Sequence, residues 1–257
     1  MILFMSFEQC GSWCEALDLV LIVLLPKSDG GRRPIGLFCT LIRLWMRARI
    51  WAARTWEATH ASSSVFAGPD MGAQKASWQE SFAAEAAALT GDEHAQGLLD
   101  LVKAFETIPH HVLVQAAASL GYPLRLLRLS VAAYRLRRSV GVEGAYSATI
   151  RACRGITAGS GFATSELKVL LHDLVVLLHA RWPYTLSVKL YVDDLTLSAS
   201  GQPQQVIQVV VDAIDFAVEY LEDGLIMEAS AKKSKVCQLQ LGCRCYPGGN
   251  CHAACLS

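Results

Sequence analysis

Two adjacent aspartates interrupt a regular alternation of residue types, and this stretch constrains the fold more than any other. In the sequence VKLYVDDLTLSAS, residues 188–200, apolar positions alternate with polar or aromatic ones on both sides of Asp193 and Asp194. A period of two is typical of half-buried β-strands. The pattern therefore predicts a β-hairpin with the two aspartates at its tip.

The paired carboxylates at this tip are a candidate metal site. Neighbouring carboxylates repel each other and lose solvation in a cleft, so Asp193 and Asp194 are favoured together where a cation neutralises them. Their hard oxygen atoms suit Mg²⁺. A solvated Asp-Asp turn is the alternative, because Asp is a common turn former.

A second segment offers a third carboxylate. In LLDLVKAFETIPHH, residues 98–111, an apolar strand-like run carries Asp100 and is followed by the turn former Pro109. Together with the hairpin, Asp100 would give three carboxylates for a pair of metal ions. We expect His110 and His111 to cap the next helix, since no Cys or His partner lies at metal-ligand spacing.

Basic residues are concentrated in two segments of a chain whose formal charge is zero. Neutrality argues weakly against nucleic-acid binding, which depends on Lys and Arg. However, residues 27–54 hold seven basic residues against one acidic residue, and residues 125–138 hold five basic residues and no acidic one. The sequence therefore predicts two local positive surfaces.

Other periodicities predict a mixed α and β chain. A hairpin is expected around the turn PKSDGG and another around Glu143 and Gly144. Helices are expected over residues 40–60, 74–89, 112–120, 161–180 and 205–222, with a further helix beginning at Pro123.

Composition indicates a globular protein, because 53% of the residues are hydrophobic and 18% are charged. The apolar run over residues 16–25 is too short for a membrane span and has no basic segment before it, as a signal peptide would. Nine cysteines without a secretory signal favour reduced thiols in an intracellular protein. The Cys-rich tail, residues 241–257, has no standard zinc spacing and is expected to be irregular; a zinc-binding interaction protein stays open as an alternative.

The Tyr-x-Asp-Asp hairpin, preceded by a strand end of the form Asp-x-x-x-Ala-aromatic, resembles the palm of reverse transcriptases, especially those of non-LTR retroelements. The likeness extends to a Lys, Gly-rich turn and Arg-Pro-Ile segment at residues 27–35, a glycine-rich turn at 154–160 and a lysine motif at 230–234. The order of such segments across about 200 residues is more specific than any one of them.

This resemblance implies an α+β fold of the right-hand polymerase type. It would have an antiparallel palm sheet backed by helices and no complete thumb. The implied division is a fingers portion over residues 1–90, a palm over residues 91–240 and the tail over residues 241–257.

The resemblance also implies RNA-templated DNA polymerase activity with two Mg²⁺ ions, or Mn²⁺, that transfers a nucleotidyl group from a dNTP to a primer 3′-hydroxyl. Asp100 and Asp193 would bridge the ions. Asp194 and the main-chain carbonyl of Leu101 would complete the ligand set.

Roles for five further residues are carried over from the family. Lys27 and Arg33 would contact the triphosphate, Phe105 would exclude a ribose 2′-hydroxyl, and Gly155 would lie under the base pair being formed. Lys233 would protonate the leaving pyrophosphate as a general acid.

The implied partners are an RNA template, a DNA primer, dNTP and further domains of a longer polyprotein, with no membrane, in the nucleus or the cytoplasm. Two other interpretations of the same fold stay open: a truncated or decayed reverse transcriptase without activity, and the palm of an RNA-dependent RNA polymerase.

Overall fold

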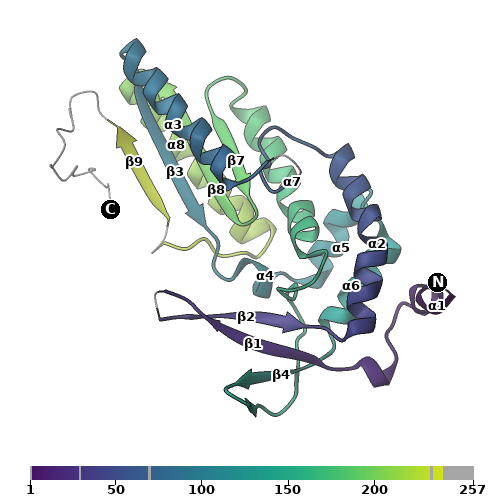
Figure 1. Ribbon diagram of the computed structural model, residues 1–257. Helices are drawn as coiled ribbons and strands as arrows, with labels where there is room; N and C mark the ends of the chain where they lie inside the picture. The colour runs from purple at the N-terminus through teal and green to yellow at the C-terminus, as the bar shows by residue number, and fades with distance from the viewer. Residues whose placement is uncertain (1, 29, 69–70, 232–233, 240–257) are drawn as a thin grey trace. The chain divides into compact units, whose positions relative to one another are not determined.

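The computed structural model describes residues 2–28, 30–68, 71–231 and 234–239 (Figure 1). The chain separates into two compact units whose segments interleave along the sequence. The first unit comprises Met1–His60 and Lys103–Leu170, and the second comprises Ala61–Val102 and Leu171–Ser257. The division at residues 90 and 240 into fingers, palm and tail stays a prediction, and the cysteine-rich tail lies outside the described residues.

The first unit combines helices with a small mixed sheet. The sheet has the order β2-β1-β4-β5, with β6 also pairing with β4; β1 and β4 are parallel and the other pairs antiparallel. Its elements are α1 (Ile2–Cys10), η1 (Glu15–Leu17), β1 (Val20–Pro26), β2 (Arg32–Leu37), α2 (Thr40–Thr59), α4 (Ala104–Thr107), α5 (His110–Ser119), α6 (Leu124–Tyr134), β4 (Arg137–Val142), β5 (Ala145–Tyr146), β6 (Ile150–Arg151) and the first half of α7 (Ala163–Arg181).

The core of the first unit is built on the apolar face of α2. Trp45 is fully buried on that face, and its ring meets the ring of Phe162 edge-on at a centroid distance of 5.4 Å. Beside this core, the fully buried carboxylate of Glu166 accepts a 2.5 Å hydrogen bond from the hydroxyl of Tyr134. Burial raises the pKa of Glu166 to about 7, although the hydrogen bonds from Tyr134 and Ser130 act to lower it.

The second unit is organised around a four-stranded sheet of order β7-β8-β3-β9, antiparallel throughout. The antiparallel sheet predicted for the palm is therefore confirmed. The elements are α3 (Ala73–Thr90), β3 (Glu93–Asp100), the second half of α7, β7 (Ser187–Tyr191), β8 (Asp194–Gly201), α8 (Pro203–Glu219), η2 (Tyr220–Gly224) and β9 (Lys235–Leu239).

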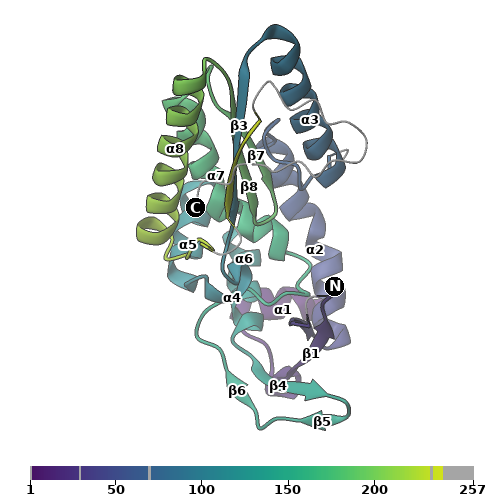
Figure 2. The same ribbon diagram turned by 90° about the vertical axis from the view of Figure 1, so that its left-hand side faces the viewer.

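Helices α3 and α8 cover opposite faces of this sheet (Figure 2). On the α8 side the contact is apolar, because Val206 and Val210 pack on Ala95 and Ala199. Gly97 of β3 permits the close approach, since a Cβ at this position would lie 2.4 Å from Cδ1 of Ile214. On the α3 side the sheet presents polar and charged residues, which form the site described below.

Most predicted elements are confirmed within a few residues, including the predicted end of α3 at Gly91, which is left-handed with φ +80°. The predicted capping role of His110 and His111 is wrong. Helix α5 begins at His110, and its N-cap Pro109 makes no side-chain capping bond. His110 turns inward instead and is 3% exposed. Over the described residues, none of the helices is both long and apolar enough to cross a bilayer.

Candidate active site

The predicted hairpin with Asp193 and Asp194 at its tip is confirmed. Strands β7 and β8 are joined by a two-residue turn, Val192 and Asp193, and Tyr191 pairs with Asp194 across it. Two-residue hairpin turns require a positive φ, which Gly or Asn usually supplies. Here Val192 adopts φ +58°. A β-branched residue in this region is strained, and such strain is concentrated at functional sites.

Asp100, the last residue of β3, lies directly opposite Asp194, the first residue of β8. Directly opposite residues share a face of the sheet, with Cβ atoms about 4.5–5.5 Å apart. Like charges in this position are destabilising by themselves. Because carboxylate pairs are favoured where a cation neutralises them, the geometry fits a divalent metal ion.

The end of β3 that carries Asp100 is held by a segment from much later in the chain. The main-chain N–H of Ser230 donates to the carbonyl of Asp100 at 2.8 Å, and the N–H of Val102 donates to Glu228 at 2.9 Å. The N–H of Asp100 also donates to the Ser234 hydroxyl at 3.4 Å. These serines belong to the predicted lysine motif, whose Lys233 lies outside the described residues.

Leu101 and Asp193 lie beside a different cavity from that of Asp100 and Asp194. Both line a small apolar cavity, which they share with Leu171, Leu174, Val175, Leu190, Leu195 and Leu221. The structure therefore places Asp100 opposite Asp194, and Leu101 and Asp193 in the lining of one small cavity. No three His, Cys, Asp or Glu side chains in the described part of the chain are arranged as a metal site. The shared ligand set of all four residues stays a prediction.

Asp100 and Asp194 open onto a cavity of about 590 Å³ between α3 and the sheet. Both walls carry polar as well as apolar residues, and the lining comprises Ala73, Ala76, Ser77, Glu80, Ser81, Ala84, Gln96, Leu98, Leu99, Asp100, Lys189, Tyr191, Asp194, Leu195 and Thr196.

One group of polar residues beside this cavity was not predicted from the sequence. Glu80 of α3 forms an ion pair with Lys189 of β7 and accepts hydrogen bonds from His94 of β3 at 2.9 Å and Ser198 of β8 at 3.1 Å. Burial raises the pKa of Glu80, but the hydrogen bonds from His94 and Lys189 and the charge of Lys189 lower it to about 2. The sequence signal that could have revealed this group was Lys189, because a charge on an otherwise apolar strand requires a buried partner.

The four predicted nucleotide-binding residues lie in the first unit. Lys27 directly follows β1, and Arg33 lies on β2 opposite Leu25. Both side chains are exposed, on the two arms of one hairpin. Exposed cations on adjacent arms are able to bind phosphate oxygens.

The structure brings Phe105 and Gly155 together. The N–H of Ile156 donates to the carbonyl of Phe105 at 2.6 Å, and the N–H of Gly155 donates to Ile108 at 2.7 Å. Gly155 has φ +92°, and a Cβ there would lie 2.5 Å from the carbonyl oxygen of Glu106. Only glycine satisfies both conditions, so the position requires this residue.

Comparison with solved structures reveals the same fold in two telomerases. Apo telomerase from Candida tropicalis, truncated of its C-terminal domain, matches 90% of this chain with 13% identity and a TM-score of 0.60. Telomerase from Candida albicans, in complex with the TWJ fragment of telomeric RNA, matches 91% with 12% identity and a TM-score of 0.59. The chain spans 52% and 45% of these two proteins, respectively. At this identity the likeness shows the fold alone.

Sequence comparison assigns the family. No curated protein matches the chain. The family model described as reverse transcriptase (RNA-dependent DNA polymerase) matches residues 25–244, a range that contains every predicted site residue. The α+β fold, with the fingers and palm arrangement of its structural neighbours, agrees with that match. The chain therefore belongs to the reverse transcriptase (RNA-dependent DNA polymerase) family.

Proposed function

We propose that this chain is the catalytic part of a reverse transcriptase of non-LTR retroelement type, which extends a DNA primer on an RNA template by nucleotidyl transfer from dNTP. The observation that carries the proposal is the facing pair of Asp100 and Asp194 beside the strained Val192 turn. Two carboxylates fixed opposite each other on neighbouring strands cost stability in a purely structural sheet, and a polymerase needs such a pair.

Reverse transcriptase domains generally use divalent metal ions. In this proposal Asp100 and Asp193 would be the principal ligands, with Asp194 and the main-chain carbonyl of Leu101 as supporting ligands, and Mg²⁺ is the favoured ion because all these ligand atoms are oxygen. When bound, two such ions lower the pKa of the primer hydroxyl and stabilise the charge that develops on the α-phosphate.

The residues of the first unit would bind and select the nucleotide. Lys27 and Arg33 would bind the triphosphate, for which the planar guanidinium of Arg33 offers paired donors. Phe105 would exclude a ribose 2′-hydroxyl, and its main chain is held beside Gly155 by the hydrogen bond to Ile156. Lys233 would give a proton to the leaving pyrophosphate.

The direct test is primer extension on poly(rA) annealed to oligo(dT), with dTTP and Mg²⁺. We expect extension by the wild type and a loss of at least ~100-fold in Asp194→Asn, because a ligand of the ions loses its charge. Asp215→Asn is the matched control, since Asp215 is an exposed acid on α8. Circular dichroism would establish that each variant is folded.

Two outcomes would contradict the proposal. A folded wild type that extends no primer would favour a decayed, non-catalytic reverse transcriptase. Extension that survives Asp194→Asn would remove the assigned carboxylate from the reaction. Phe105→Ala tests the sugar selection separately: we expect it to admit rNTP, whereas an unchanged preference would exclude Phe105 as the selecting residue.

A further inference from the structure

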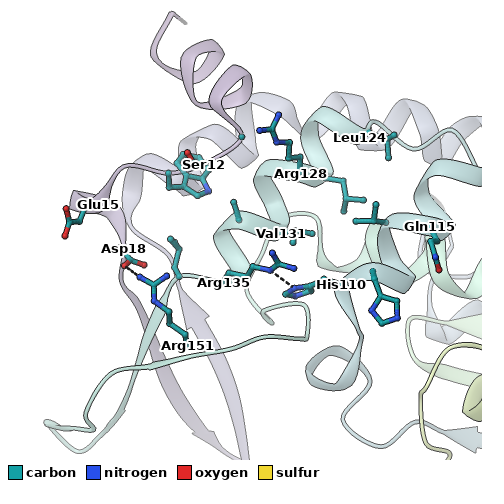
Figure 3. Close-up of a pocket in the computed structure, with 17 residues that line it drawn as sticks. Ser12, Glu15, Asp18, His110, Gln115, Leu124, Arg128, Val131, Arg135 and Arg151 are labelled. Atoms are coloured by element: carbon teal, nitrogen blue, oxygen red, sulfur yellow. Dashed lines mark hydrogen bonds and ion pairs between the residues drawn. The ribbon is translucent and has the colours of Figure 1, made fainter.

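A large cavity in the first unit has no part in the proposed reaction. It has a volume of about 1080 Å³ and lies between the segment that follows α1 and the helices α5 and α6 (Figure 3). None of the predicted catalytic, metal or nucleotide-binding residues lines it. Most of its apolar lining is aliphatic, from Val114, Leu124, Leu127, Val131 and Leu136. The volume is at the upper end of the range for ligand pockets, and it would hold several side chains.

Two arginines bring positive charge to this apolar lining. Arg128 donates to the carbonyl of Cys10 at 2.8 Å, and Arg135 donates to Nδ1 of His110 at 3.1 Å, so both bind neutral acceptors. Over the described residues, neither forms an ion pair with a carboxylate. Arg151 differs, because it pairs with Asp18 at 2.6 Å. An anionic occupant would balance the positive charges of Arg128 and Arg135.

Arg135 is held in place by a buried histidine. Nε2 of His110 donates to the carbonyl of Gly155 at 2.9 Å, which leaves Nδ1 as the acceptor for Arg135. Burial lowers the pKa of His110, and the charges of Arg135 and Arg138 lower it further, against the raising effect of the bond to Gly155. The ring is therefore neutral, and it fixes a guanidinium whose remaining donors suit a carboxylate.

The spacing along α6 indicates the shape of the occupant. Leu124, Arg128 and Val131 of α6 and its C-cap Arg135 recur at intervals of three or four residues, so they lie along one side of the helix. The two arginines are two turns apart, about 10.5 Å along the axis. A helix with two acidic residues two turns apart and apolar residues between them would complement this surface.

We propose that this cavity binds an acidic amphipathic helix of a protein partner, whose carboxylates pair with Arg128 and Arg135. The lining disfavours RNA, which is recognised largely by stacking on aromatic side chains. Within the described part of the chain, the lining contains no Phe or Tyr, and its Trp13 donates to the carbonyl of Leu129 and packs edge-on against Trp45. The ring of His110 is held by Gly155 and Arg135.

The test is a selection from displayed helical peptides of ~16 residues, about four and a half turns, against the whole chain. We expect the selected peptides to carry acidic residues seven positions apart with apolar residues between them. Fluorescence anisotropy of a labelled selected peptide should show binding that Arg128→Glu with Arg135→Glu weakens at least ~10-fold. A peptide with Lys at its two acidic positions should bind that variant better than it binds the wild type.

Arg43→Glu is the matched control, because Arg43 is exposed on α2 and does not line the cavity. If charge reversal unfolds the chain, Arg128→Gln with Arg135→Gln removes both charges and keeps hydrogen-bond donors. Failure to enrich any peptide, enrichment of peptides without paired acids, or binding that survives both double variants would overturn the proposal. Displacement of the peptide by a short oligouridine RNA, whose own binding the double variants abolish, would identify a nucleic-acid surface instead.

Discussion

Glu80 and the pair of Asp100 and Asp194 line the same cavity on the same face of one sheet, yet they face different kinds of group. Glu80 is surrounded by donors from three strands, and its pKa is about 2. Asp100 instead faces another carboxylate across the ladder. The cation that balances Glu80 is built into the chain as Lys189, whereas the geometry at Asp100 fits a cation from solution.

This difference distinguishes a structural carboxylate from the pair that we propose to be catalytic. A carboxylate satisfied by the protein's own donors fixes elements in place, and here it joins α3 to three strands. A pair of like charges fixed opposite each other gains no stability from the pairing. It is expected where function outweighs stability. Four substitutions would test this difference, and the largest effect is expected at Glu80 and its partner Lys189.

Lys189→Met should destabilise the chain most. It removes the built-in cation and leaves the largely buried carboxylate of Glu80 without it, which costs about 3 kcal/mol of unfolding free energy. Urea unfolding at neutral pH would measure the loss. In the double variant, Glu80→Gln should restore more than half of the lost unfolding free energy, because the carboxylate that has lost its cation is then removed. A loss below ~1 kcal/mol would show that Lys189 does not balance Glu80.

The unfolding free energy should change with pH as the titration of Glu80 predicts. Its pKa of about 2 in the folded chain lies below the ordinary value of 4.5. The stabilisation is therefore complete above pH 4.5 and is lost as the pH falls through 2. A shift of this size corresponds to about 3 kcal/mol.

Urea unfolding of the wild type and of Glu80→Gln at pH 6 and near pH 3 would test this sign. We expect most of the difference between the two proteins to disappear at the lower pH. A difference that stays constant, or grows as the pH falls, would show that Glu80 is not held in its charged form.

Asp194→Asn should have the opposite effect on stability from a change at Glu80. In EDTA it removes the repulsion from Asp100, so we expect the unfolding free energy to rise by about 0.2–1 kcal/mol. Mg²⁺ should raise the melting temperature of the wild type more than that of the variant, because ligand binding stabilises the folded state. Asp215→Asn should respond as the wild type does. Equal Mg²⁺ responses in wild type and Asp194→Asn would argue against metal binding here.

The local elements and the facing carboxylates were open to prediction because their signals lie within short windows of sequence. The alternation around Asp193 fixes the hairpin, and the strand that ends at Asp100 is recognised by its own apolar run. The pairing of Glu80 with Lys189 was not predictable in the same way. The two residues are 109 positions apart, and no local pattern specifies which helix covers the polar face.

His110 shows a second reason why part of the site was missed. A histidine directly after a proline at a helix start is consistent with a cap, and its direction depends on the tertiary environment. In the folded chain its partner Gly155 lies 45 positions away. The need for glycine at that position likewise comes from the carbonyl of Glu106, which only the folded chain brings close.

Val192→Gly should give the smallest change in stability and still separate strain from function. Glycine relieves the left-handed conformation at φ +58° but adds freedom to the unfolded chain, so the net gain is about 0.5 kcal/mol. Because the neighbouring Asp193 would then be held less firmly, we expect primer extension to fall while the melting temperature rises slightly. Val192→Ala, which keeps the strain of a side chain, should retain more activity than the glycine variant. Equal activity in both would mean that the rigidity of this turn contributes nothing to the placement of the carboxylates.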